Sequence, residues 1–80
     1  MRPIVKAILI IADDYMKVFD TKISGDKLIL DYIKNNKIYY TIKIEENKGM
    51  LVLTFKKEKT TKTIPVDELK DILDTYKKEQ

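Results

Sequence analysis

The chain lacks the residue patterns on which catalytic and metal sites usually depend. Its 80 residues include no Cys and no His, and its two glycines do not form a Gly-rich phosphate loop. Two adjacent acid pairs, Asp13–Asp14 and Glu45–Glu46, both fall at predicted turns. Catalytic carboxylate pairs come instead from separate elements around a cleft. We therefore predict that the protein is not an enzyme and that it binds no metal and no cofactor.

The remaining chemical feature is tyrosine interleaved with lysine. Tyr39 shares a predicted strand face with Lys43, and the most basic window, KKEKTTK, begins at Lys56. Exposed aromatic rings flanked by lysines are typical of proteins that bind single-stranded nucleic acid without sequence preference. Because Arg2 is the only arginine, attraction to phosphates is favoured over readout of base edges. The residues predicted to bind nucleic acid are Lys43, Lys56, Lys57, Lys59, Lys62 and Tyr39.

Simpler interpretations of the same residues stay open. Tyr32 and Phe19 are expected near Tyr39, but all three rings also suit the core or a helix contact. The Lys-rich run also suits an exposed loop, solubilising surface, or an edge strand that lysines protect from pairing with another sheet. The charge is uneven, since residues 28–64 carry eight Lys against four acids and residues 65–80 carry three Lys against five. This distribution predicts a basic sheet and an acidic C-terminal segment.

Residues 38–56 are predicted to form the β-hairpin that organises the fold. In the first arm, one set of alternate residues is predicted to face the core: Ile38, Tyr40, Ile42 and Ile44. The other set is predicted to face solvent: Tyr39, Thr41, Lys43 and Glu45. The Asn-Lys-Gly sequence at 47–49 predicts a type I turn followed by a bulge, because Gly49 tolerates positive φ.

Further strands and one helix are predicted around this hairpin. In the apolar run at 4–12, Ile4, Ile8, Ile11 and Tyr15 fit a helical stripe, but five β-branched residues favour a strand buried on both sides. Further strands are predicted at 15–23, 28–33 and 60–66, and turns at 13–14, 24–26 and 34–37. A helix is predicted at 68–78, with Asp67 as its N-cap. The predicted fold class is α+β, an antiparallel meander of five to six strands closed by one C-terminal helix.

The second half of the chain resembles a known family. The run YYTIKIEENKGMLVLTFKKEKTTKTIPVDELKDIL is similar to the single-stranded DNA-binding core of the PC4 transcriptional coactivator family. The matching positions are Tyr40 to Ile44, Gly49, Leu51 to Lys56, Lys62, Ile64, Val66, Asp67 and Leu69. The resemblance implies strands that bind single-stranded DNA and helices that pair two copies. A pleckstrin-homology-like half barrel and a Lys-rich chromatin protein of small-barrel type remain alternatives.

Size and composition predict one small domain that associates with itself. A chain this short buries only about 60 to 65 per cent of its unfolded surface, and it has no disulfide or structural metal. Because residues 4–11 are more apolar than one small face can hide, we expect a homodimer. The Lys- and Ile-rich composition fits a thermophilic source or an AT-rich genome.

The expected location is the cytoplasm. The apolar run is far shorter than the roughly 20 residues of a membrane span and has no cleavage-site pattern, so no membrane partner is predicted. The absence of Cys fits a reducing compartment. The alternative to nucleic-acid binding is a protein-interaction or regulatory module, such as an accessory protein of a virus or mobile element, that binds a partner protein.

Overall fold

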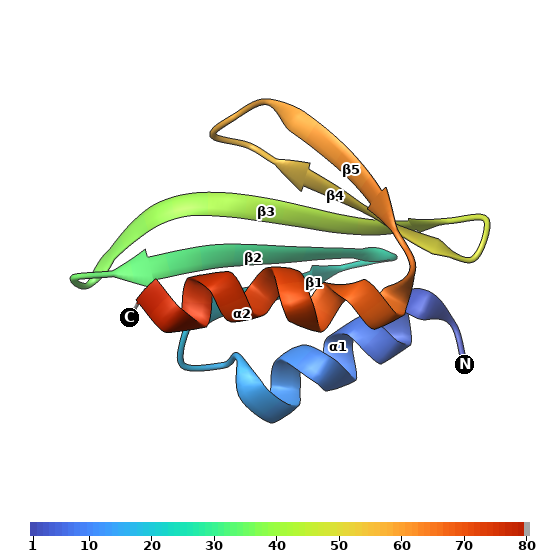
Figure 1. Cartoon of the computed structure of the whole chain (residues 1–80), viewed down its shortest axis with the longest axis horizontal. Coiled ribbons are helices and arrows are strands. Elements are labelled where there is room, and N and C mark those ends of the chain that lie inside the picture. Colours follow the sequence, from blue (N-terminus) through green and yellow to red (C-terminus); the bar gives the residue numbers. More distant parts are fainter. Residues whose placement is uncertain (80) are drawn as a thin grey trace.

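The computed structural model describes residues 1–79, which form an α+β fold of one sheet and two helices (Figure 1). In chain order, the elements are α1 (Pro3–Asp14), β1 (Phe19–Ser24), β2 (Lys27–Lys34), β3 (Lys37–Asn47), β4 (Met50–Phe55), β5 (Thr60–Ile64), a 3-10 turn (Val66–Glu68) and α2 (Leu69–Glu79). The predicted antiparallel meander with a C-terminal helix is confirmed, and it has five strands.

The sheet is open and antiparallel, in the order β1-β2-β3-β4-β5. The β2–β3 and β3–β4 hairpins close through two residues each, Asn35–Asn36 and Lys48–Gly49, and all four have positive φ. This is the type I′ geometry, whose twist matches that of the strands. The prediction of a type I turn plus bulge at 47–49 is therefore wrong. Lys48 (φ 51°) also adopts the left-handed conformation, and Asn47 pairs with Met50.

The N-terminal apolar run is a helix, so the prediction of a buried strand at 4–12 is wrong. The helix α1 begins with Pro at its first position, which suits a helix start, and it includes the predicted turn at 13–14. Ile4, Ala7 and Ile11 recur at helical spacing and are buried against the sheet. Helix propensity disfavours β-branched residues by only a few tenths of a kcal/mol each. Burial of three side chains outweighs that cost.

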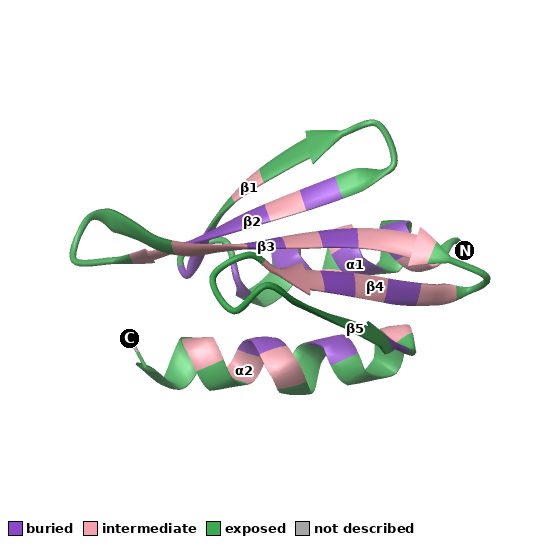
Figure 2. Cartoon of the chain, turned by 90° about the horizontal axis from the view of Figure 1, so that it is seen from above, coloured by how far each residue is buried: buried purple, intermediate pink, exposed green. Residues whose placement is uncertain are grey.

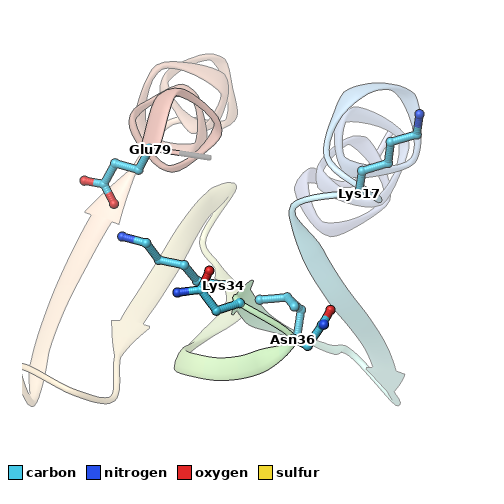
Figure 3. Close-up of a pocket in the computed structure, with 6 residues that line it drawn as sticks. Lys17, Lys34, Asn36 and Glu79 are labelled. Carbon is cyan, nitrogen blue, oxygen red and sulfur yellow. The ribbon is translucent and has the colours of Figure 1, made fainter.

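Both helices cover the same face of the sheet (Figures 1 and 3). In the close-up of Figure 3, α1 and α2 appear side by side above the strands. The core lies between this face and the helices, and it comprises Ile4, Ala7, Ile11, Tyr15, Val18, Phe19, Leu28, Leu30, Tyr32, Ile42, Ile44, Leu51, Leu53, Ile64, Leu69 and Leu73. Buried positions alternate along β4, as the banding in Figure 2 shows. No helix formed by residues 1–79 covers the other face of the sheet (Figure 1).

The C-terminal helix lies where the sequence predicts it, but its start differs. Leu69 and Leu73 are buried, and Ile72 and Tyr76 pack partly against the core, which confirms the predicted apolar stripe. The predicted N-cap, Asp67, instead lies inside the 3-10 turn, and no side chain caps that turn. Pro65 fixes an extended backbone just before the turn, and helical structure begins at Val66, two residues earlier than predicted.

Ion pairs and hydrogen bonds connect α1 to the rest of the molecule at both its ends. Before the helix, Arg2 contacts Glu46 at 2.6 Å and Asp26 at 3.2 Å. After it, the Tyr15 hydroxyl donates hydrogen bonds to the Asp74 carboxylate and the Lys70 carbonyl of α2. Neither helix of residues 1–79 is long and apolar enough to cross a membrane.

Candidate nucleic-acid interface

A bulge in β3 sets the position of Tyr39. Tyr32 of β2 pairs with Tyr40, but the next residue, Ile33, pairs with Ile38, so Tyr39 is an extra residue in β3. The Tyr39 ring contacts the rings of Tyr32 (6.2 Å between centroids) and Tyr40 (6.1 Å) on the helix-covered side. The prediction that Tyr39 faces the opposite side is therefore wrong, because the bulge breaks the alternation of the strand. For the same reason, Ile38 is exposed and not part of the core.

Tyr39 is the exposed end of an aromatic cluster formed by Phe19, Tyr32, Tyr40, Tyr76 and Tyr39. Centroid distances within the cluster include 5.8 Å for Phe19–Tyr32, 5.4 Å for Tyr32–Tyr76 and 5.1 Å for Tyr40–Tyr76. Phe19 and Tyr32 are buried, as the simpler interpretation of those rings expected, whereas Tyr39 is 54% exposed. The cluster therefore anchors a rigid ring whose outer part is open to solvent.

Two tyrosines of this cluster, Tyr32 and Tyr76, have raised pKa values. Burial raises the pKa of Tyr32 and of Tyr76, and the carboxylate of Glu79 raises both further. The Tyr32 hydroxyl donates to the carbonyl of Tyr76 at 3.3 Å. Both phenols therefore keep their protons at neutral pH, and the hydrogen bond connects the strand to the end of α2.

Two lysines lie over the Tyr39 ring. The Nζ atom of Lys57 is 4.2 Å from the ring centroid, and that of Lys34 is 5.5 Å from it. Both distances are within the range of a cation–π interaction. Lys34 was not among the residues predicted from the sequence. The only signal for it was its position beside the Asn35–Asn36 turn, which brings the end of β2 next to the start of β3.

The Lys-rich run forms the exposed turn between β4 and β5. Lys56, Lys57 and Lys59 belong to this four-residue turn, and Lys59 has a φ of 58°. The amide of Lys56 donates to the carbonyl of Thr41 at 3.1 Å, so the turn is held beside β3. One tight turn thus carries three of the predicted lysines, and Lys57 among them contacts Tyr39; the turn between β4 and β5 is exposed (Figure 2).

The other two predicted lysines lie elsewhere. Lys43 is opposite Ile29 and Thr54 on the face without helices, where it forms an ion pair with Glu45 at 3.4 Å. Lys62 is opposite Leu53 on the helix-covered side of β5. Side chains of directly paired residues share a face of the sheet. The six predicted residues therefore do not form one surface, because β3 and β5 present Lys43 and Lys62 to opposite sides.

Two open hollows flank the exposed tyrosine. One, of about 470 Å³, is lined by Tyr39, Tyr40, Lys57, Glu58, Thr75, Tyr76 and Glu79. The other, of about 380 Å³, is lined by Lys17, Ile33, Lys34, Asn35, Asn36 and Glu79 (Figure 3). In Figure 3, Lys34 extends from its strand toward the end of α2, where Glu79 lies. Glu79 lines both hollows, so this end of the molecule is basic but not uniformly so.

We name this end of the molecule the Tyr39 patch, and define it as Tyr39 with Lys34, Lys56, Lys57 and Lys59. Two carboxylates, Glu58 and Glu79, lie beside it. Among residues 1–79, no group of three or more His, Cys, Asp or Glu side chains is placed to hold a metal ion. The patch itself offers an aromatic face and ammonium groups.

Comparison of the chain with protein-family models, curated proteins and solved structures gives no match. The resemblance to the PC4 family therefore stays a prediction from the residues that carry it.

Proposed function

We propose that the protein binds nucleic acid without sequence specificity, with a preference for single-stranded DNA, through the Tyr39 patch. One observation carries this proposal: the Tyr39 ring is half exposed, and the Nζ atoms of Lys57 and Lys34 lie 4.2 Å and 5.5 Å from its centroid. An aromatic ring that accepts a stacked base, next to lysines that attract phosphate, is the usual arrangement in sequence-tolerant single-strand binders. The PC4 resemblance implies the same class of ligand.

Base stacking and phosphate contact are compatible at this ring. A base that stacks on Tyr39 either takes the face away from Lys57 or displaces its ammonium group. A lysine stem is flexible and carries three donors, so a displaced Lys57 can reach the neighbouring phosphate. The duplex form hides its base faces within the stack, whereas an unpaired strand presents them. The stacking ring therefore favours single strands.

The two carboxylates beside the patch limit its affinity. Glu58 and Glu79 line the same hollow as Tyr39 and Lys57, and they repel phosphates. Binding therefore depends on the four lysines of the patch, Lys34, Lys56, Lys57 and Lys59. If each neutralises one phosphate of a single strand, the log-log slope of affinity against salt is about −3. We expect weak binding that is lost at high ionic strength.

Fluorescence anisotropy of a labelled oligothymidylate, titrated at several salt concentrations, tests the stacking ring. Tyr39→Ala should weaken binding by roughly 1 to 3 kcal/mol and leave the salt slope unchanged, because a stacking surface is lost while the charges remain. Tyr39→Phe, which keeps the ring, should bind as the wild type does. Wild-type protein that binds neither single- nor double-stranded oligonucleotides at low salt contradicts the proposed function.

The same titration separates the lysines of the patch from lysines elsewhere. Replacing Lys57 and Lys59 by Gln should flatten the salt slope by about one to two units, because two phosphate contacts are removed. Lys48→Gln is a matched control, since Lys48 is exposed on the β3–β4 turn, outside the patch. Lys62→Gln is a second control on β5. Equal loss of slope in all variants would show that only net charge matters.

A protein-interaction function is the second candidate, and an exposed apolar surface on α1 favours it. Leu9 and Met16, on or just after α1, are each at least half exposed. Pull-down from a lysate, with and without nuclease, separates the two candidates. Partners that survive nuclease treatment favour protein interaction, and partners that disappear favour nucleic acid.

A further inference from the structure

The outer side of α1 carries an apolar ridge. Val5, Leu9 and Ala12 are exposed and follow each other at spacings of four and three residues, so they form one line along the helix. Leu9, at the centre of the line, is 50% exposed. Val5, Leu9 and Ala12 define the α1 ridge, which lies away from the face that packs on the sheet. Met16 follows just after the helix ends and is 57% exposed, and its sulfur lies beside Thr21 of β1.

Two opposite charges flank the α1 ridge on one side. Lys6 and Asp13 are seven residues apart, and both are exposed, so they lie on the same side of the helix about two turns apart. Neither forms an ion pair within the residues 1–79 that the structure describes, although Asp13 adds a weak attraction to Lys70. Both side chains are therefore free to pair with a neighbouring molecule.

We propose that the α1 ridge binds the α1 ridge of a second copy of this chain, with the two helices antiparallel about a two-fold axis. In an antiparallel pair, Lys6 of each copy comes opposite Asp13 of the other, so two ion pairs form by symmetry. In a parallel two-fold pair, the charged sides of the two ridges would lie at opposite edges of the contact, so no Lys6–Asp13 pair would form. The order of the charges along the helix therefore selects the antiparallel arrangement.

The ends of the ridge also fit this arrangement. A shallow hollow of about 520 Å³, lined by Ala12, Asp13, Asp14, Met16, Lys17, Val18 and Lys77, lies at the C-terminal end of α1. Antiparallel pairing brings Val5, at the N-terminal end of the other ridge, to this hollow, together with Met1, which precedes that helix. Met1 is the most exposed of the large apolar residues. The pairing thus covers apolar groups at both ends as well as at Leu9.

The size of the ridge predicts a weak dimer. A helix of 12 residues is about 18 Å long, and one helix–helix contact of that length buries less than the roughly 1,600 Å² of a standard interface. We therefore expect a dissociation constant of about 10 to 100 μM, which corresponds to the weak end of specific association. The proposal is independent of nucleic-acid binding, because no residue of the Tyr39 patch belongs to the ridge.

Sedimentation velocity of the full chain from about 1 to 300 μM tests this proposal over the expected range of dissociation constants. Leu9→Asp should raise the dissociation constant at least about tenfold, because it places a charge at the centre of an apolar contact. Ile23→Asp is the matched control: Ile23 is 60% exposed, against 50% for Leu9, but lies on β1. It should associate as the wild type does. Circular dichroism checks that both variants keep the fold.

A charge exchange tests the antiparallel register. Lys6→Glu should weaken association about three- to tenfold, because two attractions become two repulsions. The double variant with Lys6→Glu and Asp13→Lys should return to within about twofold of the wild type, since it restores both pairs in reverse.

Three results would overturn the proposal: a monomeric mass throughout the concentration range, association that Leu9→Asp leaves intact, or a double exchange that does not restore it. If the chain is monomeric and instead sediments with phospholipid vesicles, the ridge binds a lipid surface and not a second copy.

Discussion

The two helices of this protein pack on the same face of the same sheet, yet they are built differently. In α2, one stripe is apolar, with Leu69 and Leu73 buried, and the outer face carries charges. In α1, residues 4–12 are apolar on nearly every side, and Lys6 is the only charge among them. A helix that covers a sheet needs only one apolar face. The second apolar face of α1 is therefore not explained by the fold of one copy.

The difference between the two helices lies in their outer faces, which folding of the monomer does not require to be apolar. The outer surface of α2 is charged, with acids at the start of the helix and Lys77 and Lys78 in its last turn. Negative charge near the start and positive charge near the end of a helix both interact favourably with the helix dipole. The sequence of α1 has no acid in its first turn and no base in its last. Its stability in the fold comes from buried side chains and from its contacts to α2. Its outer side keeps apolar groups that the monomer does not use.

The largest expected effect contrasts the two faces of α1. Ile11→Ala should lower the free energy of unfolding by about 2 to 5 kcal/mol, because Ile11 is buried in the core and its loss leaves a cavity. Leu9→Ala, on the outer face, should change it by no more than about 0.5 kcal/mol. Urea denaturation at a few micromolar protein, below the expected dimer range, measures both.

The corresponding residue of α2 provides the control. Leu73→Ala should behave as Ile11→Ala does, since both side chains are buried against the same sheet face. Similar losses for Ile11→Ala and Leu9→Ala would show that the outer face of α1 also contributes to the monomer fold. The contrast between a face of α1 that stabilises the monomer and a face that does not would then be wrong.

The same contrast explains which elements the sequence predicts correctly. Helix α2 was predicted because its apolar residues recur at one helical period and its other faces are polar. Helix α1 is not predicted, because apolar residues lie on nearly every side of it and no helical period of hydrophobicity stands out. Its β-branched residues also favour a strand. A helix with two apolar faces cannot be told from a buried strand by periodicity alone. The surplus apolar face that misled the prediction is the α1 ridge.

The candidate site was predicted in part for a similar reason. The Lys-rich turn is local, so Lys56, Lys57 and Lys59 were grouped by sequence alone. The bulge at Tyr39 depends on pairing with β2, and the contact of Lys34 with Tyr39 depends on that bulge. Contacts across strands are set by register, which alternation within one strand does not reveal. The grouping of the lysines on the turn is thus predictable from the sequence, whereas the side of the sheet on which Tyr39 lies is not.

A smaller effect is expected where α1 meets α2, at Tyr15. Its hydroxyl donates to the Asp74 carboxylate and the Lys70 carbonyl, and its ring is fully buried. Tyr15→Phe keeps the ring but removes both hydrogen bonds, so it should cost about 0.5 to 1.5 kcal/mol of the free energy of unfolding. Thermal denaturation at neutral pH measures this loss.

The pH dependence of the same variant shows whether the hydroxyl is the cause. Burial, with the hydrogen bond to Asp74 and nearby acids, raises the pKa of Tyr15 far above its ordinary value. The unfolded chain loses this proton from about pH 10 upward, while the folded chain keeps it, so unfolding becomes more favourable as pH rises. Wild-type stability should therefore fall more steeply above about pH 10 than that of Tyr15→Phe, by up to about 1.4 kcal/mol per pH unit. Parallel curves would show that Tyr15 ionises equally in both states.

The smallest expected effect concerns Asp14, the last residue of α1, and it appears in the acid range. Asp14 accepts a hydrogen bond from Lys70 at 3.0 Å and lies 3.6 Å from Lys77, and these contacts lower the pKa of its carboxyl. A lowered pKa gives stability that is present above the unfolded value, near pH 4, and is lost as pH falls through the folded value. The stability difference between wild type and Asp14→Asn should therefore be largest near neutral pH and should shrink below about pH 4. Asp13→Asn changes the adjacent residue, which forms no ion pair within residues 1–79, and at neutral pH it should cost less stability than Asp14→Asn when both variants are measured at a few micromolar protein. Because both partners of Asp14 belong to α2, a flat difference for Asp14→Asn would mean that charge does not hold the two helices together, and that their contact depends on Tyr15 and the core alone.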